Sequence, residues 1–280
     1  MRIHAIQTGT VAITTKWRNG AGHGRLRLVN TLLDRKWTEP LPIYAFAIEH
    51  PEGVIVVDTG ETARVSEPGY FPRWQPFFRF AVREQVQPEQ EIGPQLEQLG
   101  ILPSDVRRVV MTHLHTDHAG GLHHFPDNEI LVSRAELDYG AGLLGRLRGY
   151  PNKRWPAWFR PTLVDLPAIR FGPFPASMPL TEAGDVTLVA VPGHTPGQLA
   201  VVVEDGDPRS FSQAIAPTLR TLCCTESWTA SAPTRPPSGS RKSASSPMQP
   251  RRPPSTCRRM TPTPQLGWQH ASRSELRGRR

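Results

Sequence analysis

The sequence predicts an α/β fold, incomplete at its C-terminal end, for residues 1–207. Short apolar runs that suit buried strands recur through this part, and stretches with helix start and stop signals lie between them. The length of 280 residues allows one large domain or two small ones. Because residues 208–280 show neither pattern, we expect the folded domain to end near residue 207.

The expected strands are short and consist mainly of Val, Ile and Leu. Runs of this kind are typical of strands that are buried on both faces. They cover residues 43–48, 54–57, 109–111, 130–132, 186–191 and 199–203.

Two helices are expected between these strands. One covers roughly residues 89–99 and ends at Gly100, a residue type that commonly terminates helices. Another begins at Ser133, where Glu136 follows three residues later with the spacing of a capping box. Alternation of strands and helices favours a layered α/β domain.

The segment 208–280 has a different composition from the rest of the chain. It contains 13 Lys and Arg against two acidic residues, a formal charge of +11, whereas residues 1–207 carry −3. Ser, Thr, Pro and Arg dominate it, and all three cysteines lie in it. Such a segment buries too little apolar surface to offset the entropy of ordering, so we predict a disordered, low-complexity tail. Its charge alone would also allow nucleic-acid binding, but aromatic residues for base stacking are nearly absent.

Several protein classes are excluded by the sequence. No run of about 18 apolar residues is present, which excludes a transmembrane helix. Residues 1–13 lack the apolar segment of a secretory signal, and three cysteines are too few for a disulfide scaffold. We therefore expect a cytoplasmic protein.

Four potential metal ligands follow the expected strand 109–111 within six positions: His113, His115, Asp117 and His118. His113 and His115 alternate, so an extended backbone would direct both side chains to the same side. Asp117 and His118 follow where the chain turns, just before two glycines. Neutral imidazole and carboxylate suit Zn²⁺ and neighbouring transition metals. This spacing favours a metal centre over histidines that are merely exposed in a polar loop.

Two further residues stand directly after expected strands. His194 follows the strand 186–191 in a loop rich in Pro and Gly, and would supply a third imidazole beside His113 and His115. Asp58 ends the strand 54–57. It would either cap a turn or accept a hydrogen bond that orients a metal-bound histidine.

These three stretches resemble, in the expected order, the landmarks of the metallo-β-lactamase superfamily. The HxHxDH signature matches residues 113–118, and the Asp-Thr-Gly and Gly-His-Thr-Pro-Gly landmarks match residues 58–60 and 193–197. The resemblance covers about residues 1–207. It implies an αββα sandwich with the metal ions at one edge of the two sheets.

The resemblance also implies two zinc ions. Asp117 and His118 would help to hold the second ion, and Asp117 would in addition orient the metal-bound water. Asp58 would be the acceptor that orients a metal-bound histidine. The first zinc would be held by the three remaining imidazoles, those of His113, His115 and His194.

Within the superfamily, the late position of the signature and the aromatic-rich stretch 69–80 resemble the N-acyl homoserine lactonase branch, where such a segment borders the acyl-chain pocket. The same rings would equally suit an ordinary core or the contact of a homodimer. The expected reaction is opening of a lactone by a metal-bound hydroxide. The alternatives are hydrolysis of another ester or a thioester, as in glyoxalase II-like members, and an inactive remnant whose basic tail binds nucleic acid.

The tail departs from the family pattern, in which a bridging Asp and a late His complete the metal centre. Residues 208–280 contain no Asp, and their one histidine, His270, stands in a poor context. Reading the codons in the alternative frame permits Ala-Gly-Asp across residues 212–215 and His across 259–260. The same frame forces Asp across 260–261, because Met has a single codon. We therefore expect a frameshift between roughly residues 204 and 211, one zinc ion or none in this chain, and impaired activity.

Overall fold

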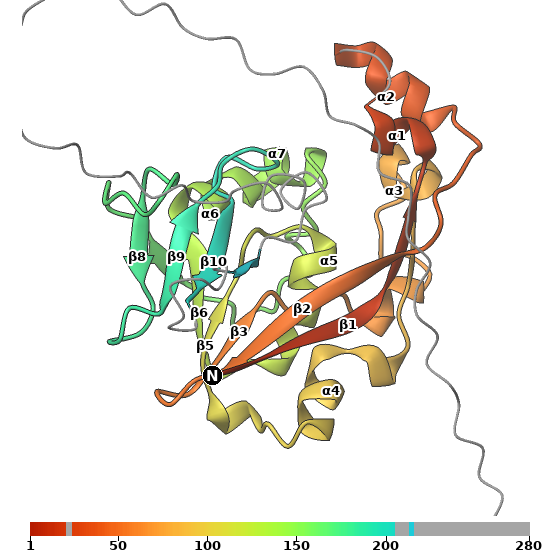
Figure 1. Cartoon of the computed structure of the whole chain (residues 1–280). Helices are drawn as coiled ribbons and strands as arrows, with labels where there is room; N and C mark the ends of the chain where they lie inside the picture. The colour runs from red at the N-terminus through yellow and green to blue at the C-terminus, as the bar shows by residue number, and fades with distance from the viewer. Residues whose placement is uncertain (21–23, 205–212, 216–280) are drawn as a thin grey trace, which may run out of the picture. The chain divides into compact units, whose positions relative to one another are not determined.

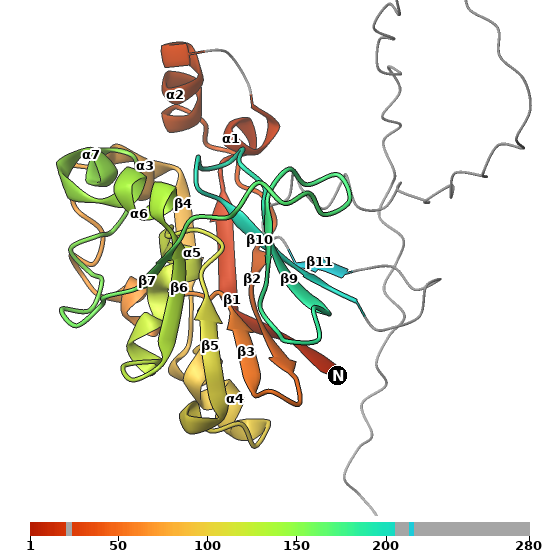
Figure 2. The same cartoon turned by 90° about the vertical axis from the view of Figure 1, so that its left-hand side faces the viewer.

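A computed structural model describes residues 1–20, 24–204 and 213–215 of the chain (Figure 1). Its strands form a seven-stranded sheet and a four-stranded sheet that face each other. Figure 2 shows helices against the outer side of the larger sheet. The α/β class predicted from the sequence is confirmed.

The larger sheet has the strand order β4-β1-β2-β3-β5-β6-β7, and the smaller sheet has the order β11-β10-β9-β8. In the larger sheet, β3, β5, β6 and β7 are parallel, whereas β4, β1 and β2 add antiparallel pairs. The smaller sheet is antiparallel. The strands are β1 (Arg2–Ile13), β2 (Leu41–Glu49), β3 (Val54–Val57), β4 (Val82–Gln85), β5 (Val106–Val110), β6 (Glu129–Ser133), β7 (Thr162–Val164), β8 (Ser177–Pro179), β9 (Val186–Ala190), β10 (Leu199–Val203) and β11 (Gln213–Ile215).

The helices are short. The α-helices are α1 (Thr15–Asn19), α2 (Gly24–Leu32), α3 (Pro76–Phe80), α4 (Ile92–Gln98), α5 (Thr116–Ala119), α6 (Arg134–Gly140) and α7 (Gly142–Leu147). The 3₁₀ segments are η1 (Ala63–Ser66), η2 (Pro88–Gln90), η3 (Pro103–Asp105) and η4 (Gly120–His124). Among the helices of the described residues, none has the length and apolar character needed to cross a membrane.

All six expected strands are present, with ends shifted by up to three residues. The expected helix 89–99 is interrupted at Glu91 between η2 and α4, and it ends before Gly100, whose φ is +78°. Ser133 is the N-cap of α6, but its side chain makes no capping hydrogen bond. The predicted capping box is therefore wrong, because the carboxylate of Glu136 accepts the backbone N–H of Leu114 instead (3.0 Å).

Two apolar layers alternate along the buried strands. In β3, Ile55 and Val57 point between the sheets, whereas Val54 and Val56 belong to the layer beneath the helices. Burying one such side chain contributes about 1.5–3 kcal/mol to folding. The layer between the sheets unites side chains of both: Ile48, Ile55, Val57, Val110, Leu131, Val164, Leu180, Val186, Leu188, Leu199, Val201 and Val203. The outer face of the small sheet is covered by side chains from loops, Phe171, Phe174 and Val191.

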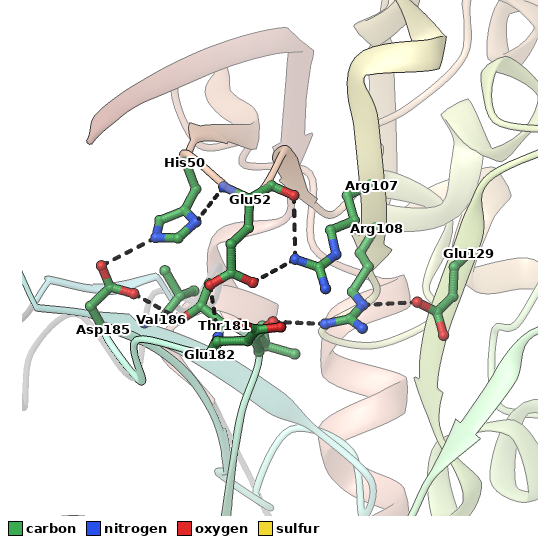
Figure 3. Close-up of polar contacts among 10 residues, drawn as sticks. His50, Glu52, Arg107, Arg108, Glu129, Thr181, Glu182, Asp185 and Val186 are labelled. Atoms are coloured by element: carbon green, nitrogen blue, oxygen red, sulfur yellow. Dashed lines mark hydrogen bonds and ion pairs between the residues drawn. The ribbon is translucent and has the colours of Figure 1, made fainter.

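A polar network joins the two sheets at the start of β3, the end opposite Asp58 (Figure 3). Arg108 donates to the carboxylate of Glu129 (2.8 Å) and to the backbone oxygen of Leu180 in the small sheet's β8–β9 turn (2.7 Å). His50 contacts Asp185 of the same turn (3.2 Å). The network fixes how the ends of the two sheets meet.

β11 pairs with β10 and lies after residue 207, where we expected the domain to end. The three cysteines, His270 and the re-read positions 259–261 lie outside the described residues. The domain boundary, the disordered tail and the frameshift therefore stay predictions.

Candidate metal centre

The parallel pairing of β3 with β5 brings two of the predicted stretches together. Val57 is paired with Val110, so the carboxyl ends of the two strands lie side by side. Asp58 directly follows one strand, and Thr112 and His113 follow the other. Their side chains converge at this sheet edge because the last residues of both strands are buried and directly paired.

Asp58 has the one left-handed backbone conformation among the described non-glycine residues, with φ of +58°. Its carboxylate is buried and accepts three hydrogen bonds. They come from the backbone N–H of Thr112 (2.7 Å), the hydroxyl of Thr112 (2.7 Å) and Nδ1 of His118 (2.9 Å). Left-handed non-glycine backbone persists where the surroundings over-determine it, as these three contacts do.

Thr112 sets the proton position on His113. Its hydroxyl has a single hydrogen, which it donates to Asp58, so it accepts from Nδ1 of His113 at 3.2 Å. Nε2 of His113 then carries the lone pair. This atom is fully buried and has no hydrogen-bond partner. A buried, unpartnered imidazole nitrogen is costly unless a cation occupies the space before it.

The imidazoles of His113, His115 and His194 converge. Each offers a nitrogen atom, and these three atoms lie within 4.8 Å of one another. Nδ1 of His115 is 2.9 Å from Nε2 of His194. The ring of His115 rests against Tyr150, with centroids 4.6 Å apart. Two loops 79 residues apart in the chain thus supply one cluster.

The three imidazoles are held neutral. Burial, with the neighbouring imidazoles, holds the pKa of His113 well below its usual range. Burial and the adjacent His194 lower the pKa of His115. The ring of His194 is partly shielded from water by the protein, although the residue as a whole is exposed, and this desolvation lowers its pKa. Neutral imidazole is the form that binds metal ions, so the cluster suits a metal ion at neutral pH.

Asp117 and His118 form a second pair beside the three imidazoles. Nε2 of His118 is 3.3 Å from Oδ2 of Asp117, while Nδ1 points at Asp58. Burial alone would lower the pKa of His118, but the carboxylates of Asp117 and Asp58 raise it to about 10. In the described part of the chain, neither residue of the pair joins a convergent group of three metal-ligating side chains.

Close backbone contacts hold the loops that carry these residues. The N–H of Gly120 donates to the carbonyl of Gly60 (2.8 Å), and the N–H of Thr59 donates to that of His118 (2.8 Å). A Cβ on Gly197, in the His194 loop, would lie 2.2 Å from the backbone nitrogen of Glu136. The glycines therefore allow the backbone approach that places the imidazoles.

Sequence reasoning missed three residues of this site. They are Thr112, which orients His113; Glu136, whose Oε1 accepts from Leu114 N; and Tyr150, which donates to Glu136 at 2.8 Å. The position of Thr112 directly before the signature was a usable signal, because a hydroxyl next to a ligand can fix its tautomer. The sequence carries no such signal for Glu136 and Tyr150, because they reach the loop around Leu114 only in the folded chain.

The aromatic stretch 69–80 packs mainly on itself and on α1. Phe71 stacks on Phe78 with centroids 4.3 Å apart, and Phe77 meets Trp17 edge-on at 4.9 Å. A surface hollow of about 430 Å³ lies over it, lined by Phe71, Pro72, Arg73, Phe78 and Arg79. Both the acyl-pocket and the dimer-contact interpretations stay predictions.

Several known proteins are similar to this chain in sequence. A sequence model described as "Metallo-beta-lactamase superfamily" matches residues 38–210. A probable metallo-hydrolase of Mycobacterium tuberculosis is 34% identical over 175 residues, which are 58% of this chain and 53% of that protein. The N-acyl homoserine lactonase AttM of Azorhizobium caulinodans is 30% identical over 173 residues, which are 58% of this chain and 60% of that protein. The chain thus spans a little over half the length of these curated relatives.

The fold also has solved counterparts. The structure of an N-acyl homoserine lactone hydrolase with N-hexanoyl-L-homoserine at its catalytic metal centre matches with a TM-score of 0.59 and 22% identity. The match covers 76% of this chain and 73% of that chain. Since the family match spans more than half of the sequence and includes all the predicted ligands, the chain belongs to the metallo-β-lactamase superfamily.

Proposed function

We propose that this chain is a zinc-dependent hydrolase that opens the ring of N-acyl homoserine lactones. The observation that carries the proposal is the buried, unpartnered Nε2 of His113, which converges with the nitrogens of His115 and His194. The similarity to lactonases named above supports the substrate class. Because the chain spans only part of those relatives, its activity is a matter for experiment.

A zinc ion fits the residues present. Three neutral imidazoles are a donor set found in catalytic zinc sites, which keep one position open for water or substrate. His113 is buried, His115 is half-buried and His194 is exposed, so the cluster opens toward solvent on one side. A bound zinc would supply a Lewis acid and lower the pKa of a coordinated water toward neutrality.

The chain's own residues would prepare this chemistry. Thr112 keeps the proton of His113 on Nδ1 and its lone pair at the centre. Asp58 holds both Thr112 and His118 in place. The carboxylate of Asp117, about one-third exposed, would orient the attacking water and, with His118, help to hold a second ion. No Ser or Cys nucleophile is required.

Loss of one imidazole tests the proposal. We expect His194→Ala to lower zinc retention and hydrolysis of N-hexanoyl homoserine lactone by about 100-fold or more, because the open zinc site needs its third ligand. His4→Ala is the matched control, since His4 of β1 pairs with Glu49 of β2 and belongs to no convergent ligand group among the described residues. A substrate panel separates lactones from esters and thioesters. A chain that hydrolyses only thioesters, or His194→Ala at wild-type activity, would contradict the lactonase proposal.

Among the described residues, we expect Asp117 and His118 to hold a second zinc, and we infer that a frameshift has removed its remaining ligands. We therefore expect a chain whose C-terminal part is translated in the alternative frame to bind more zinc and to hydrolyse lactone faster than the present chain. Metal analysis and initial rates of the two full chains measure this. Equal zinc content and equal rates would contradict it.

A further inference from the structure

A second cluster of metal-ligating side chains lies outside the centre described above. Glu91 precedes α4, and His123 and His124 end η4. One oxygen or nitrogen from each lies within 4.8 Å of the others. We propose that Glu91, His123 and His124 form a peripheral site for a divalent transition-metal ion such as Zn²⁺.

Both imidazoles converge on the same carboxylate oxygen. Oε2 of Glu91 lies 3.0 Å from Nε2 of His123 and 2.7 Å from Nε2 of His124. The two rings stand with their centroids 4.0 Å apart. Zinc–ligand distances of about 2.0–2.2 Å separate tetrahedral ligands by about 3.4 Å, so small side-chain shifts would admit the ion.

Hydrogen bonds from neighbouring residues orient the carboxylate of Glu91 and the ring of His123 toward each other. The other oxygen of Glu91 is taken up by the N–H of Ala63 (2.8 Å) and the hydroxyl of Thr62 (3.1 Å). Nδ1 of His123 lies 3.2 Å from the carbonyl of Gly120. A carbonyl only accepts, so Nδ1 carries the proton and Nε2 presents its lone pair. Backing of this kind is typical of metal-bound histidine and carboxylate.

The electrostatics of the contact between His123 and Glu91 also favour a bound cation. The lone pair of His123 Nε2 faces a carboxylate oxygen, which is itself rich in electrons. His124 can donate a proton from Nε2 to Glu91, but His123 cannot do so while Nδ1 holds its only hydrogen. A cation between Glu91 and His123 would remove this repulsion between the lone pair and the carboxylate oxygen. The cation would be either a second proton on the ring or a metal ion. The third ligand atom close by favours the metal ion.

The backbone leaves room for this arrangement. A Cβ on Gly93 would lie 2.4 Å from Nδ1 of His124, so glycine is what admits the second ring. The side chain of Glu91 is 10% exposed, that of His124 21% and that of His123 44%. The site is thus anchored on its inner side and open to water on its outer side. Two imidazoles and one carboxylate are also the protein ligands of some catalytic zinc sites.

Zinc binding by the full chain tests the site without reference to activity. Metal-free wild type, His123→Gln and His4→Gln are dialysed against Zn²⁺ alone, and the bound zinc is measured. We expect His123→Gln to bind about one equivalent less than wild type, and His4→Gln to match wild type. His4 is the control because it also pairs with a single carboxylate, Glu49, and belongs to no convergent group among the described residues.

Circular dichroism of the same samples checks that the variants fold. We expect His123→Gln to fold like the wild type, because the side chain of His123 is exposed. Equal zinc content in wild type and His123→Gln would overturn the site. If His4→Gln lost as much zinc as His123→Gln, the proposed site would be overturned too. A pair of one histidine and one carboxylate would then bind zinc as well as the group of Glu91, His123 and His124. The imidazoles of His113, His115 and His194 are intact in all three chains, so failure here leaves the proposed lactonase centre untouched.

Discussion

At the scale of single residues, Asp58 connects the parts of the metal centre. Its carboxylate contacts both Thr112, which orients His113, and His118. The sequence suggested either a turn cap or an orienting acceptor, and the contacts favour the acceptor. The backbone N–H of Asp58 is itself fixed by the carbonyl of Val110 (2.8 Å).

Substitution Asp58→Asn tests this orienting role. Asn tolerates the left-handed backbone at least as well as Asp, so the change mainly affects the charge and one acceptor oxygen. We expect zinc affinity to fall about 10- to 100-fold, the usual cost of losing a partner that orients metal ligands. Competition with a chromophoric chelator measures it, and unchanged affinity would show that the carboxylate merely caps the turn.

At the scale of elements, strand ends and loops place the ligands. The strand runs 54–57 and 199–203 were predicted with the observed bounds, because they are continuous apolar runs. β1 escaped prediction although it has 12 residues, since polar and apolar side chains mix along it and only three of its residues are buried. The capping box failed because tertiary contacts drew Glu136 to Leu114.

The loop that carries His194 depends on its close approach to α6. Gly197→Ala would place a methyl group against the backbone of Glu136, so we expect this loop to shift, zinc affinity to fall at least about 10-fold and stability to fall by about 1–3 kcal/mol. Gly193→Ala is the matched control, because the nearest atom to its Cβ would be 4.0 Å away. Similar affinity of the two variants would refute the packing argument.

The polar network of Figure 3 joins the two sheets, and Arg108 is one of the residues that bridge them. Arg108→Ala removes a hydrogen bond from a charged donor to Leu180 and one to Glu129, so we expect a loss of about 1–2 kcal/mol and a Tm lower by about 3–6 °C. Arg107→Ala should cost less, because the side-chain hydrogen bonds of Arg107 within the described residues go to Glu52 alone and Arg107 is more exposed than Arg108. Thermal unfolding that ranks the two the other way would contradict this assignment.

At the scale of the whole molecule, the sandwich brings His194 of the small sheet to the His113 loop of the large one. The family resemblance predicted that these histidines lie together. Sequence position alone would not have predicted it, because His115 and His194 are 79 residues apart. The cluster of Glu91, His123 and His124 could not be predicted either, because Glu91 lies more than 30 residues before the histidines. It becomes visible only once α4 and η4 pack together.

The account rests on a metal ion held by His113, His115 and His194. The most direct test compares the zinc affinity of two full chains, His123→Gln and His113→Gln/His123→Gln, in which the peripheral site is removed from both. We predict that the second chain binds zinc at least about 100-fold more weakly while its circular dichroism stays unchanged. Equal zinc affinity of the two chains would contradict the account.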